Sequence, residues 1–383
     1  MILDTSIITP IIMIIVTKID EVRAKLARVR HFMHECGYDA AIFLQEPNFS
    51  WLTGGGSDAV EHTNEAGKAF GNILITREGA YLLANNIEMP RILAEEVTPR
   101  IFEPVRYGWI DQKAESVVRS IVGGGALASD TPMAGAVDER SRLSLLRTPL
   151  LSAELSRFRD LCRLTAEAMR DAVEKIVPGL SEIEIAAITG YELLRRGAFP
   201  ALVLVGTDQR VFSFRHPVPT EKKLKAYCML VVCAQKWGLV SSMTRLIHFG
   251  PLPSEVADKH RAVQQIDTEI AGATRAGASL AEVFAAARNA YISAGYPGEE
   301  IRHFQGGTCG YYSREQDLTP DSTYIIHDTE VFAHNPSITG VKSEDTILLD
   351  AGTYSVLTEM PEWPADEVSR GNLTLRRPGI LVL

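Results

Sequence analysis

The residues most able to do chemistry lie in the second half of the chain. They are two histidines, His216 and His303, an arginine, Arg314, and a glutamate, Glu344. Imidazole titrates near neutral pH, so a histidine over a scissile bond can take a proton from water and return it to a leaving nitrogen. A guanidinium fork pairs bidentately with a carboxylate. By residue type alone, however, a single loop histidine is usually solvated and a single arginine usually forms an ordinary salt bridge.

Composition and charge narrow the choice of partner. The chain has 383 residues, a formal net charge of −9 and 46% hydrophobic residues, which is typical of a soluble globular protein. Nucleic-acid binding needs a basic face, and no Lys/Arg cluster here is long. No CxxC pair occurs, so neither a disulfide framework nor a zinc ribbon is indicated and a reducing cytoplasm is expected. Small molecules or peptides are better candidates than nucleic acid.

An apolar run from Ile7 to Val16 lies near the start of the sequence. At about ten residues it is too short to span a bilayer. Asp4 precedes it in place of a basic stretch, which argues against a signal peptide. We therefore expect residues 1–17 to form a leader or an extra strand, and we expect no membrane partner.

The length of the chain predicts two domains that must position these residues. From Thr17 to Cys36 apolar residues recur at helical spacing, which indicates an amphipathic helix. Short apolar runs at 40–44, 72–76 and 80–84 indicate strands joined by turns. Residues 18–150 should therefore form a mixed α/β domain.

Residues 151–383 follow a different order of elements. A long helix is expected from about Leu151 to Ile176, and a strand-rich segment from Ala201 to Phe249. Two capping boxes, one beginning at Ser181 and one at Ser279, predict the starts of two further helices. The fold class is therefore α/β (α+β), with a domain boundary near residue 150.

Four segments of the second half, taken together, resemble the pita-bread family that includes Xaa-Pro aminopeptidases, prolidase, methionine aminopeptidase and creatinase. They are residues 214–220, 230–245, 302–315 and 331–345. The resemblance implies a creatinase-like N-terminal domain over residues 18–150 and a pita-bread catalytic domain over residues 151–383. It also predicts a homodimer with sites near the subunit interface.

The metal-dependent members of this family hold two divalent ions with two aspartates, a histidine and two glutamates. The resemblance matches these five positions to Val231 or Cys233, Ser242, His303, Asn335 and Glu344. One imidazole and one carboxylate are too few to hold a metal pair. We therefore expect no metal and no other cofactor.

Creatinase works without a metal, and the motif resemblance is closest to creatinase. Its active-site segment is matched by His303, Gly306, Tyr311, Tyr312, Arg314 and Glu315. The match implies that His303 contacts the substrate and that Arg314 binds its carboxylate, and it adds Glu315 to the substrate-binding residues. His216 matches the family's proton-shuttling histidine and is the predicted general acid/base.

The departures from creatinase concern the other end of the substrate. Two carboxylates that embrace the guanidinium group there correspond here to the neutral Thr244 and Asn335, so creatine is a poor candidate. An amide or another neutral C–N function fits better, with both side chains as hydrogen-bonding groups. Glu344 is assigned to the catalytic residues, as a base, an orienter of His216 or a binder of a substrate amine.

The sequence thus predicts a metal-independent hydrolase that acts on a C–N bond of a small carboxylate-bearing compound. Two alternatives stay open. One is a metal-dependent aminopeptidase or prolidase with an unusual ligand set. The other is a non-catalytic binding protein on the same fold, because one scaffold can host many functions.

Overall fold

The computed structural model describes residues 5–57, 67–98, 100–110, 113–371 and 373–383, and within residues 5–17 only the backbone. The chain divides into two compact units, Met1–Arg157 and Phe158–Leu383. No helix within these described ranges is both long enough and apolar enough to cross a membrane.

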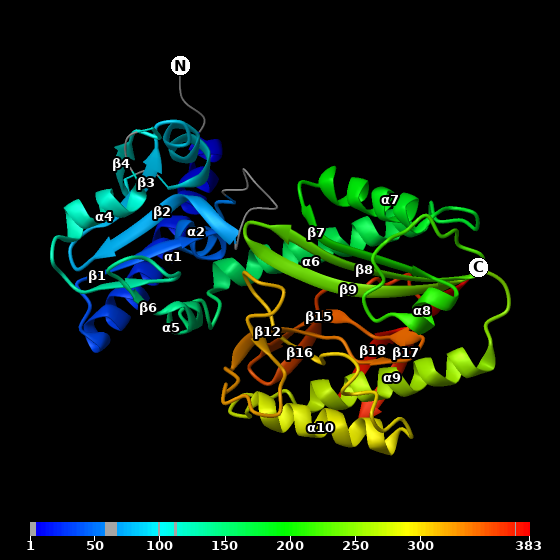
Figure 1. The fold of residues 1–383 in the computed structure, drawn as a ribbon. Coiled ribbons are helices and arrows are strands. Elements are labelled where there is room, and N and C mark those ends of the chain that lie inside the picture. The colour runs from blue at the N-terminus through cyan, green and yellow to red at the C-terminus, as the bar shows by residue number, and fades with distance from the viewer. Residues whose placement is uncertain (1–4, 58–66, 99, 111–112, 372) are drawn as a thin grey trace. The chain divides into compact units, whose positions relative to one another are not determined.

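The N-terminal unit is built on one mixed sheet in the order β4-β3-β2-β1-β5-β6 (Figure 1). Its strands are β1 (Ala40–Gln45), β2 (Lys68–Thr76), β3 (Ala80–Asn85), β4 (Glu103–Tyr107), β5 (Leu127–Ser129) and β6 (Val137–Asp138). Its helices are α1 (Thr5–Cys36), α2 (Glu46–Thr53), α3 (Met89–Arg91), the π-helix η2 (Ile92–Glu96), α4 (Ala114–Val122) and α5 (Arg140–Leu145). The three predicted strands are confirmed as β1, β2 and β3. Alternate residues of β1, Ala40, Ile42 and Leu44, share a core cluster with Val118 of α4, as the two-residue period of a strand requires.

The helix predicted to start near residue 17 begins at Thr5. Residues 5–17, expected to belong to a leader or an extra strand, are therefore helical; a short apolar run alone does not distinguish helix from strand. The division between the two compact units falls at Arg157, close to the boundary expected near residue 150. Ion pairs join the start of α6 to α1 within this unit: Glu154 binds Lys25 at 2.9 Å, and Arg157 binds Glu21 at 2.6 Å.

The C-terminal unit contains two larger sheets and two hairpins. The sheets have the orders β19-β9-β8-β7 and β11-β10-β12-β15-β16. The strands are β7 (Phe199–Thr207), β8 (Tyr227–Lys236), β9 (Leu239–His248), β10 (Gly306–Thr308), β11 (Gln316–Asp317), β12 (Thr329–His334), β13 (Ser337–Ile338), β14 (Val341–Lys342), β15 (Asp345–Asp350), β16 (Thr353–Val356), β17 (Ala365–Arg370), β18 (Leu373–Pro378) and β19 (Ile380–Val382). The helices are α6 (Ser152–Val173), α7 (Glu182–Leu194), α8 (Gln209–Ser213), α9 (Ser254–Ala273) and α10 (Leu280–Ser293).

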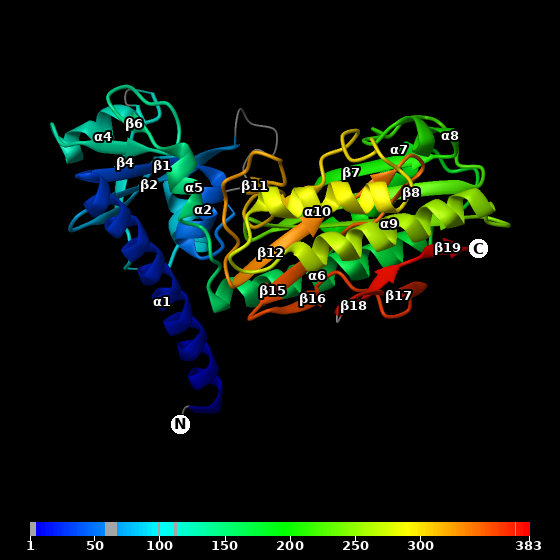
Figure 2. The same ribbon diagram turned by 90° about the horizontal axis from the view of Figure 1, so that it is seen from below.

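Helices α9 and α10 lie side by side, and their apolar faces join residues of both sheets in one core (Figures 1 and 2). Both predicted capping boxes are present at helix starts. Ser181 accepts a hydrogen bond from the Glu184 amide, and Ser279 from the Glu282 amide. These caps satisfy amides that the first turn of a helix leaves unpaired.

The β8–β9 hairpin sets which side chains face the candidate site. Its two-residue turn consists of Trp237 (φ 55°) and Gly238 (φ 76°), and paired positive φ values suit the twist of a tight hairpin. This turn fixes the register in which Cys233 lies opposite Ser242 and Val231 lies opposite Thr244.

A buried ionic network anchors the short segment that carries Glu344. Arg377 of β18 pairs with Asp267 of α9 and lies 3.5 Å from Asp345. Asp345 also pairs with Arg245 of β9 at 2.9 Å. Ser343 donates a hydrogen bond to Asp267 at 2.5 Å. The residue directly before Glu344 is thereby tied to α9 and to the C-terminal hairpin.

Adjacent arginines of β18 allow a matched test of this network. We expect Arg377→Met to lower the free energy of unfolding by about 3–5 kcal/mol, because it leaves the buried carboxylate of Asp267 without its cation. Arg376→Met should change it by less than about 1 kcal/mol, because Arg376 forms a partly exposed pair with Glu359. Urea denaturation followed by circular dichroism measures both, and equal losses in the two variants would contradict the network's importance.

Candidate active site

The two predicted histidines, His216 and His303, are in contact with each other. His216 follows α8 and is exposed, whereas His303, between α10 and β10, is only 8% exposed. Their Nε2 atoms are 3.1 Å apart, so one ring donates a hydrogen bond and the other accepts it. Desolvation lowers the pKa of His216, and the charge of Lys342 lowers it further. Burial, Lys342 and His216 lower the pKa of His303 to about 3. Both rings are therefore expected to be neutral at pH 7.

Glu344 is the centre of a second cluster. It is 2% exposed, and it lies between β14 and β15. Its Oε1 accepts a hydrogen bond from Arg314 Nη2 at 3.1 Å, and its Oε2 accepts from Lys342 Nζ at 2.7 Å and from Thr244 Oγ1 at 2.6 Å. Burial raises the pKa of Glu344, but Lys342, Arg314 and Thr244 outweigh burial and bring the pKa to about 2. The carboxylate is thus ionised and fully engaged within the protein.

Phe304 connects the two clusters. Its ring centroid lies 4.9 Å from that of His303 and 6.1 Å from that of His216. The Arg314 guanidinium lies 5.4 Å from the same ring, within the range of a cation–π contact. Phe304 is 41% exposed, so it presents an apolar surface to solvent between the histidines and the arginine.

Lys342 is the residue that sequence reasoning missed. Its side chain is 3% exposed, and an ammonium group is almost never buried unless it is paired. Its position two residues before Glu344 was the available signal, since residues i and i+2 of extended backbone share a face. The sequence does not show that Lys342 turns inward.

The remaining predicted site residues differ in their surroundings. Asn335 follows β12, is 2% exposed, and its Oδ1 has no hydrogen-bond partner among the described residues. Glu315 accepts a hydrogen bond from the backbone amide of Tyr311 at 2.9 Å. Its carboxylate thus supports the loop on which Arg314 lies. Its predicted role in substrate binding stays a prediction.

The residues at the five matched metal positions do not form a metal site. Cys233 Sγ and Ser242 Oγ are 3.2 Å apart, and burial raises the pKa of Cys233, so it stays a neutral thiol. Val231 and Asn335 carry no charge. The one carboxylate, Glu344, already binds two cations of the chain. Across the described ranges of the chain, no group of three His, Cys, Asp or Glu side chains is arranged to hold an ion.

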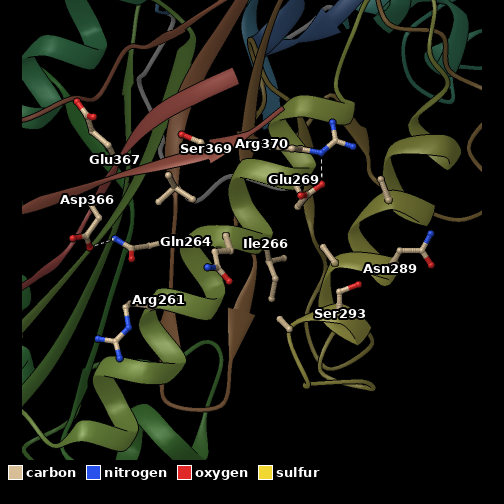
Figure 3. A pocket seen from close by; sticks show the side chains of 15 residues that line it. Arg261, Gln264, Ile266, Glu269, Asn289, Ser293, Asp366, Glu367, Ser369 and Arg370 are labelled. Carbon is tan, nitrogen blue, oxygen red and sulfur yellow. Dashed lines mark hydrogen bonds and ion pairs between the residues drawn. The ribbon is translucent and has the colours of Figure 1, made fainter. Parts of the chain in front are cut away.

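A groove of about 650 Å³ lies elsewhere in this unit, between α9, α10 and β17. Figure 3 shows Gln264 pointing to Asp366 and Arg370 pointing to Glu269 within it. None of the predicted site residues lines this groove. Its size alone would favour it as a binding site, but the acid/base groups lie in the histidine and Glu344 clusters.

Comparisons with known proteins show the family. Residues 156–351, just over half of the chain, match "Metallopeptidase family M24", and residues 25–131 match "Creatinase/Prolidase N-terminal domain". The chain therefore belongs to metallopeptidase family M24. The family and the fold class predicted from the sequence are confirmed, with a pita-bread C-terminal domain.

An uncharacterised peptidase of Staphylococcus haemolyticus is 26% identical over 225 residues, which are 56% of this chain and 63% of that protein. The match thus spans less than two thirds of this relative. An Xaa-Pro dipeptidase from Bacillus anthracis superposes with a TM-score of 0.73 at 18% identity, covering 94% of this chain and 100% of that one. A prolidase from Pyrococcus horikoshii OT3 superposes with a TM-score of 0.73 at 21% identity, covering 88% of this chain and 98% of that one.

Family membership supports a hydrolase of the peptidase kind. It favours the metal-dependent prolidase alternative over the creatinase-like prediction. Metal independence, the homodimer and the cytoplasmic location stay predictions.

The depressed pKa of His303 predicts how stability depends on pH. Between pH 6.5 and about 3 the unfolded chain protonates this histidine while the folded protein does not, so stability falls as pH falls. The wild-type free energy of unfolding should therefore decrease more steeply than that of His303→Asn, by up to about 1.4 kcal/mol per pH unit.

Urea denaturation at several pH values between 4 and 7 measures this slope. His34→Asn is the control, because His34 is exposed, and it should keep the wild-type slope. A His303→Asn slope equal to the wild-type slope would show that His303 titrates normally.

Proposed function

We propose that this chain is a hydrolase that cleaves a C–N bond of a small, carboxylate-bearing, peptide-like substrate without a resident metal pair. The single observation that carries the proposal is the engagement of Glu344 by Lys342 and Arg314, in a site that also holds a neutral histidine pair. Membership of family M24 supports hydrolysis. The uncharged residues at the matched metal positions, Val231, Ser242 and Asn335, favour a reaction carried out by side chains.

His216 is the general acid/base of this proposal. It is the exposed member of the pair and is neutral at pH 7, so it can accept a proton from an attacking water and return it to the leaving nitrogen. His303 is buried, and its Nε2 is hydrogen-bonded to the Nε2 of His216. It therefore selects the protonation state and the orientation of the His216 ring, much as a third group orients the base in other hydrolytic sites.

Arg314 is the proposed carboxylate binder. Its guanidinium presents planar donors suited to a carboxylate, and it lies beside the exposed face of Phe304. Thr244 and Asn335 are uncharged, so they fit the hydrogen-bonding needs of an amide and not those of a cation. A short peptide or an N-acyl amino acid has both features.

A second candidate is a metal-dependent peptidase, which the printed names of the relatives favour. The curated relative is called a peptidase, and the similar structures are called an Xaa-Pro dipeptidase and a prolidase. These names support a peptide substrate for this chain too. Val231, Ser242 and Asn335 stand where the metal-dependent members have carboxylate ligands, and none of them carries a negative charge, which argues against a bound metal pair.

Replacement of His216 tests the mechanism. With dipeptides and N-acyl amino acids as substrates, in buffer with EDTA, His216→Ala should lower kcat by about 10²–10⁴-fold with little change in KM, because a positioned general base contributes that much. His31→Ala, an exposed histidine of α1, should behave as wild type.

Three outcomes would contradict the proposal. Unchanged turnover in His216→Ala would exclude the role of this histidine. Activity that requires added Mn²⁺ and disappears with EDTA would establish the metal-dependent alternative. Absence of turnover under both conditions would favour a binding protein.

A further inference from the structure

The charges bonded to one another around Glu344 do not cancel. Arg314 and Lys342 each contribute one positive charge, and Glu344 contributes one negative charge. The three side chains are only 10%, 3% and 3% exposed. An uncompensated charge is costly in such surroundings, because water solvates it poorly. The cluster therefore favours the arrival of one additional anion.

Arg314 has a donor left for such an anion. Its Nη2 is used by Glu344, and its Nη1 donates to the Ser313 carbonyl. Its Nε is buried and has no hydrogen-bond partner among the described residues. The same holds for the Nε atoms of Arg245 and Arg377, but Arg314 is the one that lies beside the surplus positive charge of this cluster. Its unpaired Nε–H is therefore a donor that a ligand carboxylate would satisfy.

We propose that Lys342 is a specificity-determining residue that allows this site to accept a ligand carboxylate. The ligand carboxylate binds Arg314, and Lys342 keeps Glu344 compensated when Arg314 turns to the ligand. The inference rests on the proposed function, because the ligand is its carboxylate-bearing substrate. Lys342 thus supplies, from within the chain, the second cation that two neighbouring carboxylates require.

The count of charges makes the role of Lys342 testable. With a ligand bound, two carboxylates face two cations. Without Lys342, the ligand and Glu344 compete for Arg314, and binding weakens. With Glu344 neutralised, both cations are available, and binding strengthens. With both residues neutralised, Arg314 and the ligand form a simple pair, and binding returns close to the wild-type value.

Acetate and acetamide are suitable probes because they have nearly the same shape and differ in charge. The readout is the ¹H–¹⁵N resonance of Arg314 Nε in arginine-labelled protein, assigned with Arg314→Lys, in titrations at constant ionic strength. Acetate should shift this resonance and acetamide should not. Lys342→Met should raise the Kd for acetate by about tenfold, the effect of one lost charge interaction. Glu344→Gln should lower the Kd for acetate, and the double variant Lys342→Met/Glu344→Gln should have a Kd close to that of wild type.

Two controls separate charge from packing. Lys342→Arg keeps the charge and should bind acetate within about threefold of wild type, a difference well below that of one lost charge. Lys223→Met removes an exposed lysine and should have no effect. The proposal is wrong if acetate leaves the Arg314 resonance unchanged, or if Lys342→Met binds acetate as tightly as wild type. This equilibrium measurement does not depend on turnover, so its failure and that of the proposed hydrolysis are distinguishable.

Discussion

A buried carboxylate needs a compensating positive charge, and in this protein Lys342 and Arg314 supply it to Glu344. Both ion pairs lie within a largely buried site, where electrostatic interactions are stronger than in water. The same two cations influence the neighbouring groups. Burial, and after it the charge of Lys342, lower the pKa of both histidines, which keeps His216 in the form that can accept a proton.

The fold brings these groups together through fixed strand registers. The tight turn of the β8–β9 hairpin places Thr244 where it donates to Glu344. Pairing of β12 with β15 sets His334 opposite Asp345, so that Asn335 and Glu344 flank that pair. Hydrogen bonding of Ser343 to Asp267 completes the anchoring of the segment. A shift of one residue in these strands would turn the side chains away from the site.

Local signals in the sequence predicted much of this arrangement. The capping boxes at Ser181 and Ser279 and the strand beginning at Ala40 depend on neighbouring residues, and the structure contains them. The family motifs assigned His216 and His303 to the same active site, and their rings are in contact. These features were predictable because their causes lie within a few residues or in a shared motif.

Long-range ion pairs account for what the sequence did not predict. Residues of α6 bind α1, a pairing that no local pattern indicates. Lys342 was not among the predicted site residues, because its burial depends on elements distant in the chain.

The most direct test of the account is a titration of the purified protein with Mn²⁺ by calorimetry, combined with elemental analysis. Because Glu344 is already neutralised and the other matched positions lack charge, we predict less than about 0.1 equivalent of bound metal and no specific heat of binding. The account would be contradicted by close to two equivalents of metal that Glu344→Gln removes.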